Sequence, residues 1–381
     1  MPATTTTSTI APDPLGDADA WAAFDYHLAT RLLGAGDFAA SVAVALDGMT
    51  VHTAAFGYRV PEGDPFAVPP TTDPSTSAPT TTERQRSRRD GVVPTDRFRI
   101  ASISKVITAT VVLQLVEAGV LELDHPVGAR LGRVVGAEVT DPAIKAVTVR
   151  QLLSHTSGFP DYQTTFFGGG ARSCPEAARR GLTGGLVGPP GTVYEYSNLN
   201  FCLLGQLIGE VAGMPYQRAV RALLLRPLGI EGMRLVGTFD PDDDEVVHPS
   251  LPRRNYMEVL AGAGSWVASA EDVVTIVDAL DPDKPGWHPL SRRMTTEMLR
   301  PTVGVTYPDI ANRWYGLGAI VFADGSWGHT GTVENTHAMV LDRPDGVTWS
   351  LLVSGEYPSD TTQLRNLVDE AMAAAQLSPL S

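Results

Sequence analysis

One helix strongly constrains what this chain can fold into, because it is apolar on nearly every side. The segment 98–120 reads FRIASISKVITATVVLQLVEAGV, with an apolar run that begins at Ile100 and stops at Gly119. A helix without a polar face is normally buried, and glycine just beyond the last turn is a usual stop signal. We therefore predict a central buried helix around which the rest of the chain is organised.

Two side chains capable of chemistry, Ser102 and Lys105, lie at the start of this helix. Residues three apart on a helix share a face. A serine hydroxyl is a weak nucleophile until a base removes its proton, and lysine is such a base only where burial or a positive field lowers its pKa. Free N–H groups at the beginning of the helix can stabilise an oxyanion. The alternative is a capping serine with a lysine one turn on.

The charge and composition of the chain exclude several classes of partner. Its 381 residues carry a net charge of −14, which argues against nucleic acid or an anionic membrane as a partner. No stretch reaches the roughly 18 apolar residues that a membrane span needs. The first residues lack the basic and apolar regions of a secretory signal, so the chain as given is expected to be cytoplasmic. A chain trimmed at its N-terminus would look the same and be exported.

Neither the cysteines nor the histidines indicate a metal site. Cys174 and Cys202 form no ligand cluster, and either a disulfide or two separate buried thiols is compatible with them. The acidic run 240–245 starts like a calcium loop but lacks the glycine and glutamate that such a loop needs later. Three histidines also lack metal-like spacing, namely His125, His248 and His337. We expect no metal and no cofactor.

Composition also divides the chain into one domain and two segments without predicted structure. Residues 1–20 form a tail rich in Thr and Pro and are expected to be disordered. Residues 60–93 are rich in Pro, Thr, Ser and Arg, and we expect a disordered insertion there, with a lid on the substrate side as the alternative. Residues 21–376 are expected to be a single domain that contains this insertion.

Periodicity predicts strands at both ends of the chain and helices in the middle. A hairpin is expected over 39–58, with Asp47-Gly48 as its turn. Further strands of an antiparallel sheet are expected over 314–322, 327–330, 336–341 and 348–353. Besides the central one, helices are expected over 21–33, 147–153, 175–186, 199–211, 216–225, 270–280, 291–299 and 361–374. The pattern predicts an α+β fold, in which helices flank an antiparallel sheet and a helical lobe is inserted.

A second candidate motif is YEYSNLN at residues 194–200, in a loop that enters a helix. The hydroxyl of Tyr196 can carry a proton if a cation lowers its pKa. The amide of Asn198 can hold a substrate carbonyl or orient Lys105. Taken singly, an asparagine before a helix is usually a cap.

A third candidate motif is GHTGT at residues 328–332, near the end of a predicted strand. Glycine in such a strand allows close approach of a ligand. His329 can be a hydrogen-bond donor or a positive charge, and the backbone N–H of Thr332 can be a second oxyanion donor. A His-Thr-Gly segment alone is usually a turn.

Taken together, three segments resemble the active-site motifs of the penicillin-recognising serine enzymes, namely Ser102-Ile103-Ser104-Lys105, Tyr196-Ser197-Asn198 and His329-Thr330-Gly331. That group contains class C β-lactamases, DD-carboxypeptidases and related esterases, amidases and transacylases. The resemblance continues at 149–162, 189–213, 261–273 and 314–322, and covers roughly 39–374. It implies the β-lactamase/DD-peptidase-like fold for most of the chain.

The resemblance also implies a role for each motif residue. Ser102 would form an acyl-enzyme, Lys105 would be its base, and Tyr196 would pass the proton to the leaving group. Asn198 would hold Lys105 or the substrate amide, and the N–H groups of Ser102 and Thr332 would form the oxyanion hole. The remaining residues of the third motif would bind substrate, namely His329, Thr330 and Gly331. A turn containing His155 would lie near the site in a structural role.

One departure affects the expected substrate. In this family the third motif often begins with lysine, whose charge meets a substrate carboxylate, whereas His329 is only partly charged at neutral pH. We therefore expect an acyl-serine hydrolase acting on a small ester, amide or peptide. The alternatives are a D-Ala-D-Ala carboxypeptidase or β-lactamase, and a non-catalytic peptide-binding or sensor protein on the same fold.

Overall fold

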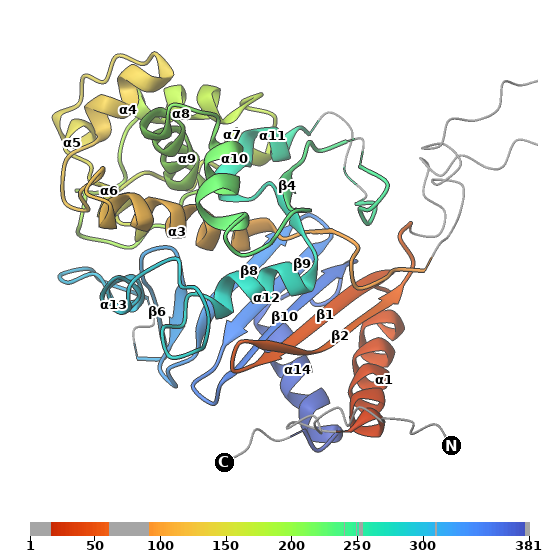
Figure 1. Cartoon of the computed structure of the whole chain (residues 1–381). Coiled ribbons are helices and arrows are strands. Elements are labelled where there is room, and N and C mark those ends of the chain that lie inside the picture. Colours follow the sequence, from red (N-terminus) through yellow and green to blue (C-terminus); the bar gives the residue numbers. More distant parts are fainter. Residues whose placement is uncertain are drawn as a thin grey trace, which may run out of the picture.

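The computed structural model describes residues 17–60, 91–239, 241–248, 250, 254–308 and 311–377. An antiparallel sheet with helices on both faces lies beside a lobe built of helices (Figure 1), so the predicted α+β class is confirmed. The first helix, α1 (Ala18–Gly34), begins three residues before the expected domain start at residue 21. The rest of the expected tail, 1–16, and most of the expected insertion, 61–90, lie outside the described residues.

Seven strands from both ends of the chain form the main sheet, in the order β2-β1-β10-β9-β8-β7-β6. Their bounds are β1 Ala39–Leu46, β2 Met49–Gly57, β6 Arg313–Tyr315, β7 Ile320–Phe322, β8 Trp327–Val333, β9 Thr336–Asp342 and β10 Val347–Ser354. The predicted hairpin is present, and its turn residues Asp47 and Gly48 both have positive φ, as a tight type I′ turn requires. The predicted strand 314–322 is instead two strands, because a turn with Gly318 at φ 91° reverses the chain.

Both faces of the sheet are covered, which explains why β1 is buried along its whole length. Alternate β1 residues belong to two different cores, as the two-residue period of a strand demands. One set, such as Val42 and Val44, packs against α1 and α14 (Thr362–Ala374). The other set, such as Ala43, faces the core that contains α12 (Ala270–Asp278) and the helical lobe.

The predicted central helix is confirmed as a buried element. It consists of a short 3-10 turn, η1 (Ala101–Ile103), followed by α3 (Ser104–Glu117), which is buried on nearly every side. Figure 1 shows α3 at the boundary between the sheet and the helical lobe. A small second sheet, in the order β3-β5-β4, leads into it, with bounds β3 Phe98–Arg99, β4 Arg234–Leu235 and β5 Trp266–Ala268.

The lobe contains more helices than the sequence pattern predicted. They are α4 Gly128–Val135, α5 Pro142–Lys145, α6 Val149–Leu153, α7 Gln163–Phe167, α8 Cys174–Leu182, α9 Asn198–Ala212, α10 Tyr216–Val220, the π turn η2 Arg221–Leu225, α11 Tyr256–Leu260 and the 3-10 turn η3 Ala261–Ala263. A last helix, α13 Arg292–Leu299, lies in the C-terminal part of the chain. The helices α4, α5, α7 and α11 were missed; α5 has only 4 residues, and α7 and α11 have 5 each. Runs that short carry little periodic signal.

The two cysteines, left open by the sequence, form a disulfide that joins α8 to α9, with 5.7 Å between their Cα atoms. In the described part of the chain, no helix is long and apolar enough to cross a membrane. The same residues contain no group of three or more His, Cys, Asp or Glu side chains that could hold a metal ion.

Candidate active site

The structure brings the first motif together as its spacing predicts. Ser102 lies in η1, and Lys105, in the first turn of α3, is fully buried. The Lys105 Nζ atom lies 3.0 Å from Ser102 Oγ, 2.9 Å from Asn198 Oδ1 and 2.7 Å from the carbonyl oxygen of Ala263. Three elements far apart in the sequence therefore meet at one amine.

The charge state of Lys105 follows from this environment. Burial lowers its pKa well below the ordinary lysine value, and the opposing field of Asp161 is the smaller effect. A neutral amine has two N–H bonds and one lone pair. The carbonyl of Ala263 and the Oδ1 atom of Asn198 can only accept hydrogen bonds, so they take the two N–H groups. The lone pair is then left for the Ser102 hydroxyl, which is the arrangement a general base needs.

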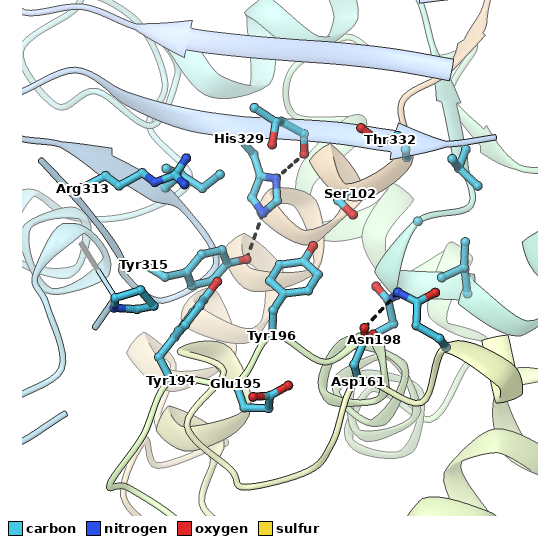
Figure 2. Close-up of a pocket in the computed structure, with 18 of the residues that line it drawn as sticks. Ser102, Asp161, Tyr194, Glu195, Tyr196, Asn198, Arg313, Tyr315, His329 and Thr332 are labelled. Carbon is cyan, nitrogen blue, oxygen red and sulfur yellow. Dashed lines mark hydrogen bonds between the residues drawn. The ribbon is translucent and has the colours of Figure 1, made fainter. Parts of the chain in front are cut away.

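The pKa of Tyr196 is raised in the structure, whereas the sequence motif suggested that a nearby cation could lower it. Its ring lies over Lys105, with Nζ 4.9 Å from the ring centroid, and its hydroxyl points toward Ser102 in Figure 2. Burial raises the pKa of Tyr196, and a hydrogen bond with Ser102 offsets this only in part. Because Lys105 is neutral, no cation counteracts the burial. Tyr196 is therefore a neutral phenol that can donate a proton, and not a tyrosinate.

Asn198 is the first residue of α9, but its side chain reaches Lys105 and does not cap the helix. The backbone N–H of Ser197 donates instead to Nδ1 of His155, at 3.1 Å, and the Asn200 amide approaches the same nitrogen at 3.0 Å. The buried His155 ring lies 4.2 Å from the Tyr196 ring, centroid to centroid. His155 thus supports both Tyr196 and the start of α9, in agreement with the structural role that the resemblance implies.

The third motif lies on β8, and both ring nitrogens of His329 are occupied. Its Nδ1 atom lies 2.5 Å from the Thr330 carbonyl, which can only accept, so Nδ1 carries the proton. Its Nε2 atom, 2.9 Å from the Tyr315 hydroxyl, therefore accepts the proton of that hydroxyl (Figure 2). Burial lowers the pKa of His329 to about 3. His329 is thus neutral, and the positive charge considered for it is absent.

Close packing of β8 against η1 defines the geometry around the nucleophile. β7 pairs with β8 only at Trp327 and Gly328, which leaves the rest of that edge of β8 to face η1. A Cβ atom at Gly331 would lie 2.4 Å from the carbonyl oxygen of Ile100 and 3.2 Å from the Ser102 nitrogen. Gly331 is therefore required for β8 to approach the nucleophile this closely. Thr332, the expected oxyanion donor, follows immediately.

Backbone strain is found beside the nucleophile. Ala101, the residue before Ser102, has a φ of 45°, in the left-handed region that side chains other than glycine seldom adopt. Such a conformation persists only where its surroundings hold it. Here Ala101 is buried, and its Cβ atom is 3.2 Å from where a Cβ of Gly331 would stand. Packing against β8 thus helps to hold the strained turn that presents Ser102.

These residues open onto a cavity of about 540 Å³. Ser102, Tyr196, Asn198, His329, Thr330 and Thr332 all contribute to its lining, whereas Lys105 lies behind them. Five aromatic side chains form a further part of the wall, namely Phe167, Tyr194, Tyr307, Trp314 and Tyr315. Three charged side chains also line it, namely Asp161, Glu195 and Arg313.

Sequence reasoning missed several of these contributors. The carbonyl of Ala263, the hydroxyl of Tyr315 and the carboxylate of Asp161 were not singled out, although all three lie in segments quoted for the family resemblance. Asn200 was missed as well, two residues beyond the second motif. Their positions in those segments were the available signal, but nothing local distinguishes them from structural residues.

Comparison with known proteins connects this site to one family. The family model described as Beta-lactamase matches residues 30–373. Penicillin-binding protein 4 of Amycolatopsis lactamdurans is 31% identical over 281 residues, covering 68% of this chain and 72% of that protein. Esterase EstB of Burkholderia gladioli is 27% identical over 328 residues, covering 73% of this chain and 82% of that protein.

Solved structures agree in fold. The D-amino acid amidase of Ochrobactrum anthropi SV3, complexed with L-phenylalanine, has a TM-score of 0.71 and 22% identity, and the match covers 94% of this chain and 100% of that chain. With a family match over residues 30–373 and the three motifs gathered around one cavity, this chain belongs to the beta-lactamase family.

Proposed function

We propose that this protein is a serine hydrolase that cleaves small esters or amides through an acyl-enzyme on Ser102. The observation that carries the proposal is the fully buried Lys105, whose amine lies 3.0 Å from the Ser102 hydroxyl and whose pKa is lowered by burial. A serine with only a capping role would not need a fully buried amine held in this orientation. EstB is a relative whose name states esterase activity, and this supports esters as one class of substrate for this protein.

The first half of the reaction is acylation. Ser102 Oγ bonds to the substrate carbonyl carbon while its proton passes to Lys105 Nζ, and the N–H groups of Ser102 and Thr332 receive the oxyanion. The bond to the leaving group then breaks, and that group takes the phenol proton of Tyr196. Lys105 returns its proton to the Tyr196 oxygen. The neutral state of Tyr196 supports this role as a proton donor.

The second half is deacylation by water. Water attacks the acyl carbon, its proton passes to Lys105 through Tyr196, and the same N–H groups receive the second oxyanion. Collapse breaks the bond to Ser102 Oγ, which recovers its proton and releases the acid. Atoms balance, since one water is consumed and one acid and one alcohol or amine are released.

The neutral His329 favours esters and amides over substrates that end in a carboxylate. A D-Ala-D-Ala peptide or a penicillin carries such a carboxylate, and an uncharged imidazole with both nitrogens occupied offers it little attraction. The carboxypeptidase and β-lactamase alternatives are therefore the weaker proposals.

Intact-mass measurements test this proposal. Wild type and Ser102→Ala are incubated with a fluorophosphonate, with p-nitrophenyl butyrate and with a fluorescent penicillin, and release of p-nitrophenol is followed in parallel. We expect one fluorophosphonate adduct and ester turnover, both lost in Ser102→Ala. A folded wild type, checked by circular dichroism, that reacts with none of the three would support the binding or sensor alternative instead.

A further inference from the structure

We propose that the substrate carries a positively charged amine near its scissile carbonyl, and that Asp161 binds this amine. The substrate class would then be aminoacyl esters and amides with a free amino group. This inference rests on the proposed hydrolase function and specifies the substrate of the same site.

The balance of charge in the cavity is the first argument. Asp161, Glu195 and Arg313 are its charged lining residues, while His329 is neutral, so the net charge of the lining is −1. Among the residues that the structure describes, none of these three forms an ion pair. Of the other arginines in the part of the chain that the structure describes, more than half have a carboxylate partner. Charges left unpaired in a cavity are available to a ligand, and a net negative wall attracts a cationic one.

The position of Asp161 relative to the reacting atoms is the second argument. Its negative charge raises the pKa of both Lys105 and Tyr196, so its field reaches the catalytic pair. Figure 2 shows Asp161 on the same side of Tyr196 as Ser102 and Asn198, whereas Arg313 lies on the other side, beyond Tyr315. An amine near the scissile carbonyl would therefore meet the negative charge and lie away from the positive one.

The third argument is that Asp161 is held in place while part of its carboxylate stays free. Its Oδ2 atom accepts a hydrogen bond from Gln163 Nε2 at 2.9 Å, and within the described residues Oδ1 has no recorded partner. The preceding carbonyl, of Pro160, accepts from the Ser197 hydroxyl at 2.7 Å. Because Ser197 lies between Tyr196 and Asn198, this bond ties the acidic residue to the second motif. A preorganised charge binds its counter-ion at a lower entropic cost.

The aromatic wall limits the kind of aminoacyl group that is compatible with the site. Tyr194, Tyr307 and Trp314 provide an apolar surface beside the charged groups, suited to an apolar or aromatic side chain. Aromatic faces also attract ammonium groups. Phenylalanine derivatives therefore combine the features that the cavity offers to a ligand.

Paired substrates that differ only in charge test the inference. Phenylalanine p-nitroanilide and its N-acetyl form, each as D and L enantiomer, are assayed with wild type, Asp161→Asn and Glu195→Gln. We expect wild type to prefer the free amine by about tenfold or more in kcat/KM. Asp161→Asn should reduce that preference at least fivefold, the size expected for one partly solvated ion pair. Glu138→Gln, which changes an exposed carboxylate of the lobe, is the matched control for net charge and should keep the preference.

A second experiment compares the same two classes of ligand by binding and does not depend on product formation. It measures how phenylalaninamide and N-acetylphenylalaninamide slow fluorophosphonate labelling of Ser102. The free amine should protect at a concentration about tenfold lower, and Asp161→Asn should abolish the difference. Equal protection by both compounds, or a preference that survives in Asp161→Asn and is lost in Glu195→Gln, would overturn the assignment. In both cases Ser102 is still labelled, so the hydrolase proposal stands. Absence of labelling would refute the hydrolase proposal itself.

Discussion

The replacement of Gly331 by alanine is a direct test of how β8 and the nucleophile are arranged. A Cβ atom at this position would lie 2.4 Å from the Ile100 carbonyl oxygen, 3.2 Å from the Ala101 Cβ and 3.2 Å from the Ser102 nitrogen. An ordinary contact needs about 3.4 Å, so β8 and η1 must separate by about 1 Å. The atoms in the way are mainly backbone, which cannot rotate aside as a side chain could.

That separation acts on the oxyanion hole more than on substrate binding. The two proposed donors are the N–H groups of Ser102 on η1 and Thr332 on β8. If the two elements move apart, both N–H groups can no longer donate to the same substrate oxygen. Misplacement by about 1 Å costs about 100-fold, and complete loss of one donor costs 10²–10³ in kcat. We therefore expect Gly331→Ala to lower kcat about 100-fold, or about 2.7 kcal/mol at the barrier, with little change in KM.

The assay is ester hydrolysis under saturating and limiting substrate, together with thermal unfolding. Gly34→Ala is the matched control, because its added Cβ would meet nothing within 4 Å and it lies on α1, away from the site. The melting temperature of Gly331→Ala should fall by only a few degrees. A folded Gly331→Ala that keeps more than a third of the wild-type kcat would refute the proposed role of the β8–η1 contact.

Three further predictions concern the base, a buried carboxylate and the disulfide. Lys105→Arg should slow fluorophosphonate labelling of Ser102 about 10³-fold, because a guanidinium stays protonated and cannot be a base. In wild type, the labelling rate should fall at acid pH as Lys105 gains a proton. Labelling of the variant at the wild-type rate would contradict this role. Burial raises the pKa of Asp37 to about 7, while its side chain accepts the Tyr357 N–H. The folded state therefore holds this proton more tightly than the unfolded state, and the stability involved is present below about pH 4 and lost as the pH rises through 7. Between pH 5 and pH 8, the free energy of unfolding measured in urea should fall by on the order of 1–3 kcal/mol in wild type and by less in Asp37→Asn. An equal fall in both proteins would exclude Asp37 as its source. Replacing Cys174 and Cys202 together by serine should lower the free energy of unfolding by about 3–4 kcal/mol for a loop of 28 residues, whereas an unchanged urea midpoint would mean that the bridge contributes nothing.

Much of the fold could be predicted from local patterns. The buried helix over 98–120, the hairpin with its Asp47-Gly48 turn and the closing helix at 361–374 all correspond to observed elements. Where the predicted bounds of an element were wrong or a helix was missed, the cause lies in nearby residues or in the short length of the element. The expected strand 314–322 divides into two strands because Gly318 adopts a positive φ, and α5 and α7 are too short to show a period. The expected helix over 175–186 ends early, at Leu182, because glycines at 184 and 185 follow it.

The motif residues of the candidate site could be predicted from the sequence, but neither their charge states nor several of their partners could. The three motifs meet at one cavity, as their resemblance implies. Sequence reasoning allowed a positive His329 and a Tyr196 whose pKa a cation lowers. Neither option fits the structure, since burial lowers the pKa of His329 to about 3 and raises the pKa of Tyr196. Burial depends on residues hundreds of positions away, which no local motif contains.

The sequence by itself therefore determined which chemistry is available, since the spacing of Ser102 and Lys105 on one helix face is a property of helix geometry alone. Only the tertiary structure decided how that chemistry is tuned. The Ala263 carbonyl and Asn198 orient the amine of Lys105, Gly331 sets how closely β8 approaches the nucleophile, and Asp161 adds an unpaired negative charge to the cavity. These contacts join segments distant in sequence, because the energies of desolvation and charge depend on distance in space.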